Sequence, residues 1–299
     1  MNSPFTNKPA RTVSVISTNF LKQEYQKQYQ LDVSKWLDTE EILVCECQET
    51  KYRFYHPFHL AGDSSFYHHL QKNNWYYMPW KWEHEMTLSY LNKKDEILEI
   101  GCGDGAFLDQ LKSKGYHAKG IDLTVESVNK AKDKGLEVSN ETIEDHAKNN
   151  TEKYDVICTF QVLEHISDPK SFIENALKCL KKNGKFIVCV PNNNSFIQYA
   201  PFNVLNAPPH HMGLWSDISL KNLCQIFPLK LLDLKFEPLQ DQHVNWYKVT
   251  NERKWLKFKL LSWFYYRLGL SKLSLKKIKR KQNTIKGHSV FAVYESSSS

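Results

Sequence analysis

Long apolar stretches are missing from this sequence of 299 residues. Every apolar run is shorter than the roughly 18 to 20 residues that a membrane-spanning helix needs. The first residues, Met1 to Lys8, lack the apolar core of a secretion signal, and low-complexity sequence is confined to Ser296 to Ser299. We therefore expect a globular, cytoplasmic protein with disorder only at the ends of the chain.

Cysteines are few, odd in number and scattered. Several of the seven lie in apolar runs where strands are expected, which excludes a disulfide framework and favours reduced, buried thiols. Cys45 and Cys47 form a C-x-C pair, and His56 and His59 follow closely enough to raise the question of zinc. The second cysteine pair of a zinc knuckle is absent, however.

Acidic residues are nearly absent from residues 251 to 287, which contain twelve Lys and Arg against the single acid Glu252. This local charge of +11 leaves −4 on the rest of a chain whose total is +7. Because the basic charge is confined to one segment, we expect no nucleic-acid partner.

The part of this segment from 254 to 281 interleaves basic with aromatic residues and is an insertion in the predicted domain. It is either a peripheral membrane contact, serving a lipid-linked substrate, or a helix that packs on the domain through its apolar side. Its aromatic residues include Trp255, Phe258, Trp263 and Phe264.

From Lys94 onward, short apolar runs alternate with helical patterns, which is typical of βαβ units. We therefore predict an α/β fold for residues 91–299, with a Rossmann-like, seven-stranded, mostly parallel sheet flanked by helices. The predicted strands are Glu96 to Ile100, His117 to Asp122, Leu136 to Asn140, Tyr154 to Phe160, Lys185 to Val190, Leu231 to Leu239 and His288 to Tyr294.

Residues 1–90 are rich in aromatic residues and show no such alternation. They are expected to form an N-terminal accessory region, with a hairpin from 42–47 and 52–55 and helices near 65–70 and 80–91. The region either closes over a ligand or packs onto the catalytic domain.

The segment most informative about ligand binding is an apolar strand that ends in Glu99 and is followed by alternating glycines, Gly101, Gly103 and Gly105. Glycine is needed where backbone turns tightly and approaches a ligand closely. The loop alone also satisfies the dinucleotide fingerprint. A pyrophosphate avoids nearby negative charge, whereas Glu99 and Asp104 suit the ammonium and sulfonium groups of S-adenosylmethionine.

Asp122 ends the second predicted strand, 23 residues after Glu99. A carboxylate at this place can accept hydrogen bonds from both ribose hydroxyls of a bound nucleoside. The alternative is a helix N-cap before Thr124. The order of strand, glycine loop, helix, strand and acid favours a nucleoside ligand.

With these motifs the chain resembles the class I S-adenosylmethionine-dependent methyltransferases, and particularly the branch that includes ubiquinone-biosynthesis O-methyltransferases. The resemblance covers about Trp82 to Asn192. Its motifs are LEIGCGDG (98–105), GID (120–122), ETIEDHA (141–147), YDVICTFQVLEHISDP (154–169) and LKKNGKFIVCVPN (180–192).

The resemblance implies eight cofactor-binding residues. Glu99, Gly101 and Gly103 line the methionine and ribose portion. The ribose is held by Asp122, and the adenine lies beside Ile143 and Glu144. The pocket is closed by Phe160 and Gln161. Asp155 is expected to be structural, and His146 is expected to face solvent.

An oxygen acceptor must lose its proton, and imidazole is suited to this near neutral pH. His165 follows the fourth strand at the edge where open α/β sheets bind ligands, and His210 and His211 follow the fifth. We treat these three as candidate catalytic residues, with substrate binding or loop packing as the alternatives.

The ubiquinone branch associates the pattern E-x-x-E-H with a divalent metal. Here Gln161 stands at the first position, while Glu164 and His165 remain. Because a hard-cation site loses a ligand and a charge without that carboxylate, we expect no metal.

The sequence therefore predicts methyl transfer from S-adenosylmethionine to a small-molecule, glycan or lipid-linked acceptor, with oxygen as the favoured target atom. Two alternatives have different consequences. One is a module that binds the cofactor without turnover, and the other is a dinucleotide-dependent oxidoreductase. The motifs indicate neither the acceptor nor the oligomeric state.

Overall fold

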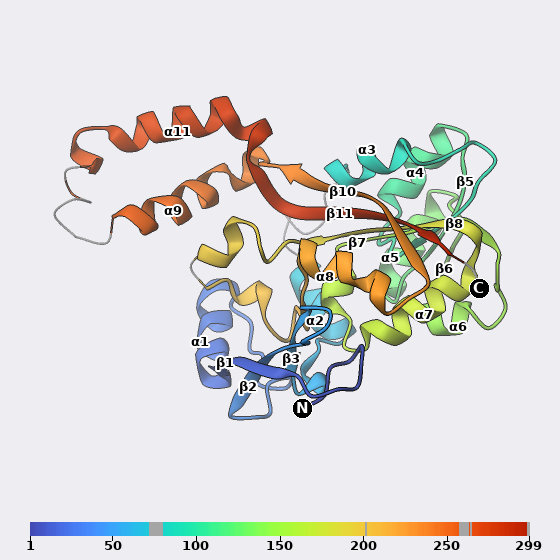
Figure 1. The fold of residues 1–299 in the computed structure, drawn as a ribbon, viewed down its shortest axis with the longest axis horizontal. Helices are drawn as coiled ribbons and strands as arrows, with labels where there is room; N and C mark the ends of the chain where they lie inside the picture. Colours follow the sequence, from blue (N-terminus) through green and yellow to red (C-terminus); the bar gives the residue numbers. More distant parts are fainter. Residues whose placement is uncertain (72–79, 201, 257–262, 264, 298–299) are drawn as a thin grey trace.

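The structure is a computed structural model that describes residues 1–71, 80–200, 202–256, 263 and 265–297 (Figure 1). Its centre is a seven-stranded sheet with the strand order β10-β11-β8-β7-β4-β5-β6. The five strands from β4 to β8 run parallel, while β11 is antiparallel to both β8 and β10. The strands are β4 (Glu96–Ile100), β5 (His117–Ile121), β6 (Val138–Ser139), β7 (Tyr154–Phe160), β8 (Leu180–Pro191), β10 (Leu229–Pro238) and β11 (Lys286–Ser296).

This sheet confirms the predicted α/β fold with a seven-stranded, mostly parallel sheet. Each predicted strand is present, although β6 is shorter than expected and β8 and β11 are longer. Strand β8 extends back to Leu180 because the chain enters it directly from the preceding helix.

Alternating side chains of the strands form two separate cores. Ile97 points to one face and packs with Phe107, and helices α3 (Trp82–Leu88) and α4 (Ala106–Ser113) cover that face. Leu98 points to the other face and packs in the cluster that contains Phe172. The second face is covered by α6 (Ile143–His146), α7 (Pro169–Cys179) and α8 (Asp217–Asn222), while α5 (Val125–Asp133) packs beside α4.

A second, four-stranded sheet has the order β1-β2-β3-β9. The predicted hairpin is confirmed as β2 (Glu41–Glu46) and β3 (Arg53–His56). The edge strand β9 (Gly213–Leu214) comes from much later in the chain and pairs with β3. Residues near the N-terminus therefore hold a loop of the catalytic part. The remaining elements here are β1 (Arg11–Ser17), α1 (Thr18–Tyr29) and α2 (Ser64–Gln71).

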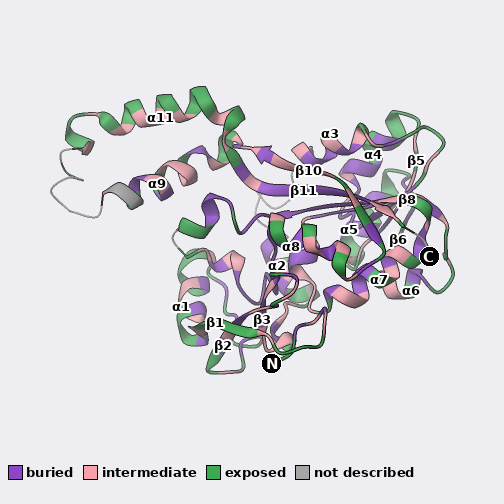
Figure 2. Cartoon of the chain, viewed as in Figure 1, coloured by how far each residue is buried: buried purple, intermediate pink, exposed green. Residues whose placement is uncertain are grey.

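Between β10 and β11 the described residues include the helices α9 (Val244–Trp255) and α11 (Leu270–Lys281), which form an arm that projects away from the sheet (Figure 1). Leu275 and Ile278 of α11 pack against the cluster that contains Phe196 and Val244, while most of α11 is exposed (Figure 2). Phe258 and Phe264 lie outside the described residues. No helix in the described part of the chain is long and apolar enough to cross a membrane.

The prediction that His146 faces solvent is wrong, because its side chain is buried. Its Nε2 lies 2.8 Å from the Tyr154 hydroxyl and its Nδ1 lies 2.9 Å from Glu141 Oε1. These two partners satisfy both ring nitrogens inside the protein. Helix α6 has only four residues, so the spacing of its apolar residues could not show which side faces the interior.

Candidate functional site

The glycine loop connects β4 to α4, and three of its residues have the left-handed backbone conformation that favours glycine. Gly101, Gly103 and Gly105 have φ angles of 79°, 54° and 78°, values that side chains with a Cβ rarely adopt. A Cβ on Gly101 would lie 2.3 Å from Cγ2 of Val162. The loop is therefore in direct contact with the segment that follows β7.

Asp122 immediately follows β5 and ties this loop to its neighbour. One carboxylate oxygen accepts the Gly103 N–H at 2.9 Å, and the other accepts the Thr124 N–H at 2.8 Å. The N-cap residue of α5 is Thr124, and no side chain caps that helix, so the helix-capping alternative for Asp122 is wrong and its contact with Thr124 is a local turn contact. Each oxygen retains acceptor capacity for a ribose hydroxyl, so these backbone contacts are compatible with ribose binding.

Glu99 is the last but one residue of β4 and is only 5% exposed. Burial raises the pKa of its carboxyl, and the charges of Asp122 and Asp104 raise it further, whereas Lys81 lowers it. Its Oε2 atom has no hydrogen-bond partner among the described residues. A buried acceptor of this kind fits the ammonium or hydroxyl groups of S-adenosylmethionine.

The other predicted cofactor residues are spread around this edge of the sheet. Ile143 is buried in the same core cluster as Ile121, which ends β5. Glu144 instead accepts a hydrogen bond from the Ser171 hydroxyl at 3.3 Å. The structure therefore places Ile143 close to the strand ends and directs Glu144 toward α7.

Phe160 and Gln161 lie where β7 ends. Phe160 packs between His84 and Phe107, with 5.4 Å between ring centroids in both pairs. Gln161 has a φ of 55°, and its amide donates to Glu83 Oε1 at 3.4 Å. Both side chains thus contact the part of the chain around α3.

The three candidate catalytic histidines come together, although His165 is more than forty residues from the other two. One ring nitrogen from each of His165, His210 and His211 lies within 4.8 Å of the other two. Ring centroids are 4.6 Å apart for His165 and His210, 4.6 Å for His210 and His211, and 4.9 Å for His165 and His211. Sequence reasoning treated these residues one at a time, and folding makes them a single group.

The hydrogen bonds of these rings assign their tautomers. Nδ1 of His165 donates to the His210 carbonyl at 2.6 Å, and Nδ1 of His210 donates to the Leu205 carbonyl at 2.9 Å. Nδ1 of His211 lies 3.0 Å from the Asn206 amide oxygen. Since an oxygen acceptor requires Nδ1 to carry the proton, the lone pair of each neutral ring is on Nε2.

Burial keeps this group neutral. It lowers the pKa of His165 to about 4. It also lowers the pKa values of His210 and His211 well below the ordinary range, and repulsion among the rings adds to the effect. Near neutral pH all three rings are therefore proton acceptors rather than cations.

Three tyrosines from the N-terminal region hold the loop that carries His210 and His211. Tyr25 donates to the Val204 carbonyl at 3.0 Å, and Tyr55 donates to the Asn206 carbonyl at 2.7 Å. The Tyr67 hydroxyl donates to the His210 carbonyl at 3.2 Å. Sequence analysis missed these residues, because aromatic enrichment was their only signal.

A second missed group lies just before and within α3. Glu83 and His84 are buried, and burial lowers the pKa of His84 to about 3. The charge of Lys81 acts on Glu99, Glu164 and His165, which places it near the same edge of the sheet. No sequence motif predicted that Lys81, Glu83 and His84 would lie near this edge of the sheet.

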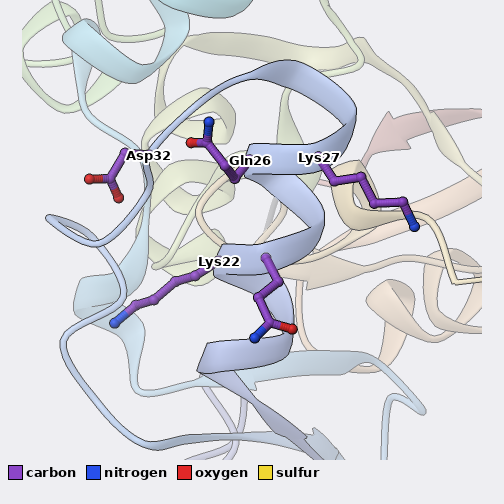
Figure 3. A pocket seen from close by; sticks show the side chains of 5 residues that line it. Lys22, Gln26, Lys27 and Asp32 are labelled. Atoms are coloured by element: carbon purple, nitrogen blue, oxygen red, sulfur yellow. The ribbon is translucent and has the colours of Figure 1, made fainter.

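A separate hollow lies beside α1 and is lined by polar residues of that helix and the following loop (Figure 3). Lys22, Gln26, Lys27 and Asp32 point in different directions around it. The hollow lies far in the fold from the ends of the parallel strands and contains none of the candidate residues. We assign it no part in the site.

Comparison with protein families identifies the catalytic part of the chain. The family described as "Methyltransferase domain" matches residues 75–253. The chain is 30% identical over 121 residues to the ubiquinone biosynthesis O-methyltransferase of Salmonella paratyphi A, a match that covers 36% of this chain and 50% of that protein. The enzyme of Salmonella newport matches with the same identity and coverage. The chain thus spans about half the length of the curated relatives it matches.

Two solved structures share the fold at low sequence identity. A complex of the Trm112 methyltransferase activator with a methyltransferase of Haloferax volcanii matches at 14% identity and a TM-score of 0.52, covering 72% of this chain and 89% of that one. Protein PH0226 of Pyrococcus horikoshii matches at 12% identity and a TM-score of 0.50, covering 79% and 100%. The glycine loop alone fits either a dinucleotide or S-adenosylmethionine, and the family match favours S-adenosylmethionine. The chain belongs to the methyltransferase domain family, and S-adenosylmethionine is its cofactor.

Proposed function

We propose that the protein transfers the methyl group of S-adenosylmethionine to a hydroxyl of a small-molecule, glycan or lipid-linked acceptor. The observation that carries this proposal is the histidine group of His165, His210 and His211 at the end of β7, next to the glycine loop that follows the neighbouring strand β4. The cofactor supplies an electrophilic methyl group. The protein must therefore place the acceptor, exclude water and remove one proton.

The histidine group is placed to assist the last of these tasks by accepting a hydrogen bond from the acceptor hydroxyl, although burial makes each ring a weak base. Its rings are buried and neutral, and their Nδ1–H groups are engaged, so each presents an Nε2 lone pair. The contact between Gly101 and Val162 connects this group to the cofactor loop. A hydroxyl bound at the histidines would thus lie close to the bound cofactor.

The cofactor itself would be held by residues that the resemblance implies. Gly101 and Gly103 allow close approach of the methionine and ribose portion, and Asp122 accepts from the ribose hydroxyls. Glu99 supplies the buried acceptor described above. Ile143 and Glu144 beside the adenine, and Phe160 and Gln161 at the pocket wall, complete the proposed cofactor set.

The test is methyl transfer from methyl-labelled S-adenosylmethionine to cell extract separated into water-soluble and lipid fractions. We expect labelled product in one fraction, with mass spectrometry identifying a methyl ether. His211→Gln should reduce transfer by roughly 10²- to 10⁴-fold, the usual contribution of a proton-transfer residue. His117→Gln is the matched control, because this exposed histidine begins β5, at the end of the parallel strands opposite the site.

The competing function is a module that binds the cofactor without turnover. It predicts tight S-adenosylmethionine binding by calorimetry and no label in any fraction. A methylated carbon or nitrogen in the product would instead reject the oxygen assignment while leaving methyl transfer intact.

We also propose that the arm formed by α9 and α11 contacts an anionic lipid surface, which suits a lipid-linked acceptor. Leu268 and Leu273 are 67% and 62% exposed, and Trp263 is 52% exposed. No acidic residue occurs from Leu270 to Gly287. Apolar side chains beside cations are the composition of interfacial helices. The six exposed cations of α11 are Lys272, Lys276, Lys277, Lys279, Arg280 and Lys281.

The alternative, in which α11 only packs on the domain, has partial support from the buried contacts of Leu275 and Ile278. Co-sedimentation with vesicles separates the two. The variant with Lys276, Lys277, Lys279, Arg280 and Lys281 all changed to Gln should lose binding to anionic vesicles, since each basic residue near such a surface contributes roughly 1 kcal/mol.

The matched control changes five exposed lysines elsewhere to Gln and should bind as the unmodified protein does. Binding should also fall as salt rises and be weak on neutral vesicles. No binding to anionic vesicles at low salt would reject the lipid contact and direct the acceptor search to soluble compounds. The control lysines are Lys51, Lys114, Lys132, Lys182 and Lys221.

A further inference from the structure

The histidine group has a property that proton transfer alone does not require. A single base needs one imidazole, whereas here three neutral rings place nitrogens within 4.8 Å of one another. Three imidazoles with one nitrogen each gathered this closely offer a complete set of nitrogen donors to a single cation. This arrangement is typical of a metal site with three imidazole ligands.

We propose that His165, His210 and His211 bind one divalent transition-metal ion of the zinc class. Tetrahedral zinc with Zn–N distances of about 2.0 to 2.1 Å separates two ligand nitrogens by about 3.4 Å. The nitrogens of the histidine group therefore need to approach by at most about 1.4 Å, which side-chain rotation can supply. The fourth position is left for an oxygen ligand.

The surroundings of the rings match those of known metal ligands. A histidine that binds a metal usually donates its other ring N–H to a carbonyl or carboxylate, which fixes the ring and its tautomer. All three rings do so here, to the His210 and Leu205 carbonyls and to the Asn206 amide oxygen. Asn206 is itself held by its amide N–H, which donates to Asn193 Oδ1 at 2.7 Å.

The backbone around the ligands is also held in place before any ion binds. The tyrosine contacts to the carbonyls of Val204, Asn206 and His210 hold this loop, and the Met212 N–H donates to the Glu164 carbonyl at 2.7 Å. The last contact joins the loop directly to the segment that carries His165. Ligands supported in this way bind metal without a large ordering cost.

The ligand set selects the class of ion. Among the described residues, the cluster contains three imidazoles and no carboxylate. Neutral nitrogen ligands suit zinc, cobalt, nickel and copper, whereas magnesium and calcium require oxygen. The expectation of no metal was drawn from Gln161 and concerns a hard-cation site with carboxylate ligands. The site proposed here uses different residues and a different class of ion.

Such an ion would act on the acceptor. With their Nε2 lone pairs on the ion, the histidines would no longer accept the acceptor proton themselves; the ion would instead lower the pKa of an acceptor hydroxyl at the fourth position, which would release its proton to solvent on binding. The oxygen could then form its bond to the methyl carbon as the carbon–sulfur bond breaks, which leaves S-adenosylhomocysteine. This use of the ion rests on the proposed function, but binding of the ion does not.

The experiment titrates Co²⁺ into untagged, chelator-treated protein and follows visible absorption, which reports the coordination geometry. We expect one Co²⁺ per chain, intense bands of a four- or five-coordinate ion, displacement by Zn²⁺ and no displacement by Mg²⁺. His211→Ala should weaken binding by at least about 100-fold, and Asn206→Ala by about 10- to 100-fold, the range for a residue that orients a ligand. His117→Gln, a change at an exposed histidine that begins β5, should bind as the unmodified protein does.

Calorimetric binding of S-adenosylmethionine by each variant shows that it is folded and tests the cofactor site separately. Absence of Co²⁺ bands in the folded, unmodified protein would overturn the proposal, as would undiminished Co²⁺ binding by a folded His211→Ala variant. Metal binding without methyl transfer would leave this inference standing and reject the proposed function. Methyl transfer without metal binding would reject this inference and leave the proposed function standing.

Discussion

The two sides of the ligand-binding edge are built in different ways. On the cofactor side, Glu99, Gly101, Gly103 and Asp122 lie within 24 consecutive residues of one βαβ unit. On the histidine side, the three histidines come from a segment after β7 and from a loop that residues near the N-terminus hold in place. The first side depends on a left-handed backbone conformation that favours glycine. The second depends on contacts between segments far apart in the chain.

This difference predicts that substitutions on the two sides affect different measurements. Changes to the glycine loop should alter cofactor affinity and leave the histidine group intact. Changes to the N-terminal contacts should alter the histidine group and leave cofactor affinity unchanged.

The largest effect is expected for Gly101→Val. The new side chain would clash with Val162 and would need a φ of 79°, so we expect S-adenosylmethionine affinity to fall by more than about 100-fold. Gly115→Ala is the control, because Gly115 has a φ of 75° but no atom within 4 Å of the new Cβ. Its cost should be limited to about 1 to 2 kcal/mol of stability, with unchanged affinity in calorimetry. Equal loss of affinity in both variants would contradict the steric explanation.

A pH-dependent effect is expected at Glu237, which lies in β10 beside the histidine side. Burial and the charge of Glu83 raise its pKa to about 7, although the Ser289 N–H donates to it at 3.1 Å. An acid whose pKa is raised on folding stabilises the protein least at high pH. The stability of the unmodified protein, relative to Glu237→Gln, should therefore decline between about pH 4.5 and 7, by up to about 3 kcal/mol.

Urea unfolding at several pH values measures this difference. Glu174→Gln, on the exposed surface of α7, is the control and should follow the unmodified protein. A constant difference between Glu237→Gln and the unmodified protein from pH 5 to 8 would show that Glu237 is ionised in the folded state.

Asp122→Ala should weaken S-adenosylmethionine binding by about 1.5 to 3 kcal/mol, the range for lost hydrogen bonds to a charged group. The substitution also removes the acceptor for the Gly103 and Thr124 N–H groups. Asp155→Ala is a suitable control, because Asp155 similarly accepts the Glu96 N–H and pairs with Lys181, at the opposite end of the sheet. If both variants lose stability and neither loses affinity in calorimetry, Asp122 has a structural role only.

The smallest effect is expected for Tyr55→Phe, which removes one hydrogen bond to the Asn206 carbonyl. We expect a loss of about 1 kcal/mol in the free energy of unfolding. Cofactor affinity should not change, while Co²⁺ affinity should fall because Asn206 orients His211. A change in cofactor affinity of more than threefold would show that the two sides are coupled.

Much of the fold could be predicted because its signals are local. Apolar runs such as Tyr154–Phe160 are strands buried on both sides, and the loop between β4 and α4 has glycine at three positions with positive φ. His146 was predicted incorrectly, because its environment depends on Tyr154 and on a helix of one turn. Strand β9 was not predicted, because two residues carry no periodicity and pair only when β3 is already present.

The sequence by itself determined the α/β class, the cofactor loop and the methyltransferase family, since each rests on residues that are neighbours in the chain. It also supplied His165, His210 and His211 as three separate candidates. Only the tertiary structure decided that these rings form one group, that the His210 carbonyl orients the distant His165, and that the N-terminal tyrosines hold their loop. The physical reason is that ring orientation and burial depend on long-range packing, which no local pattern records.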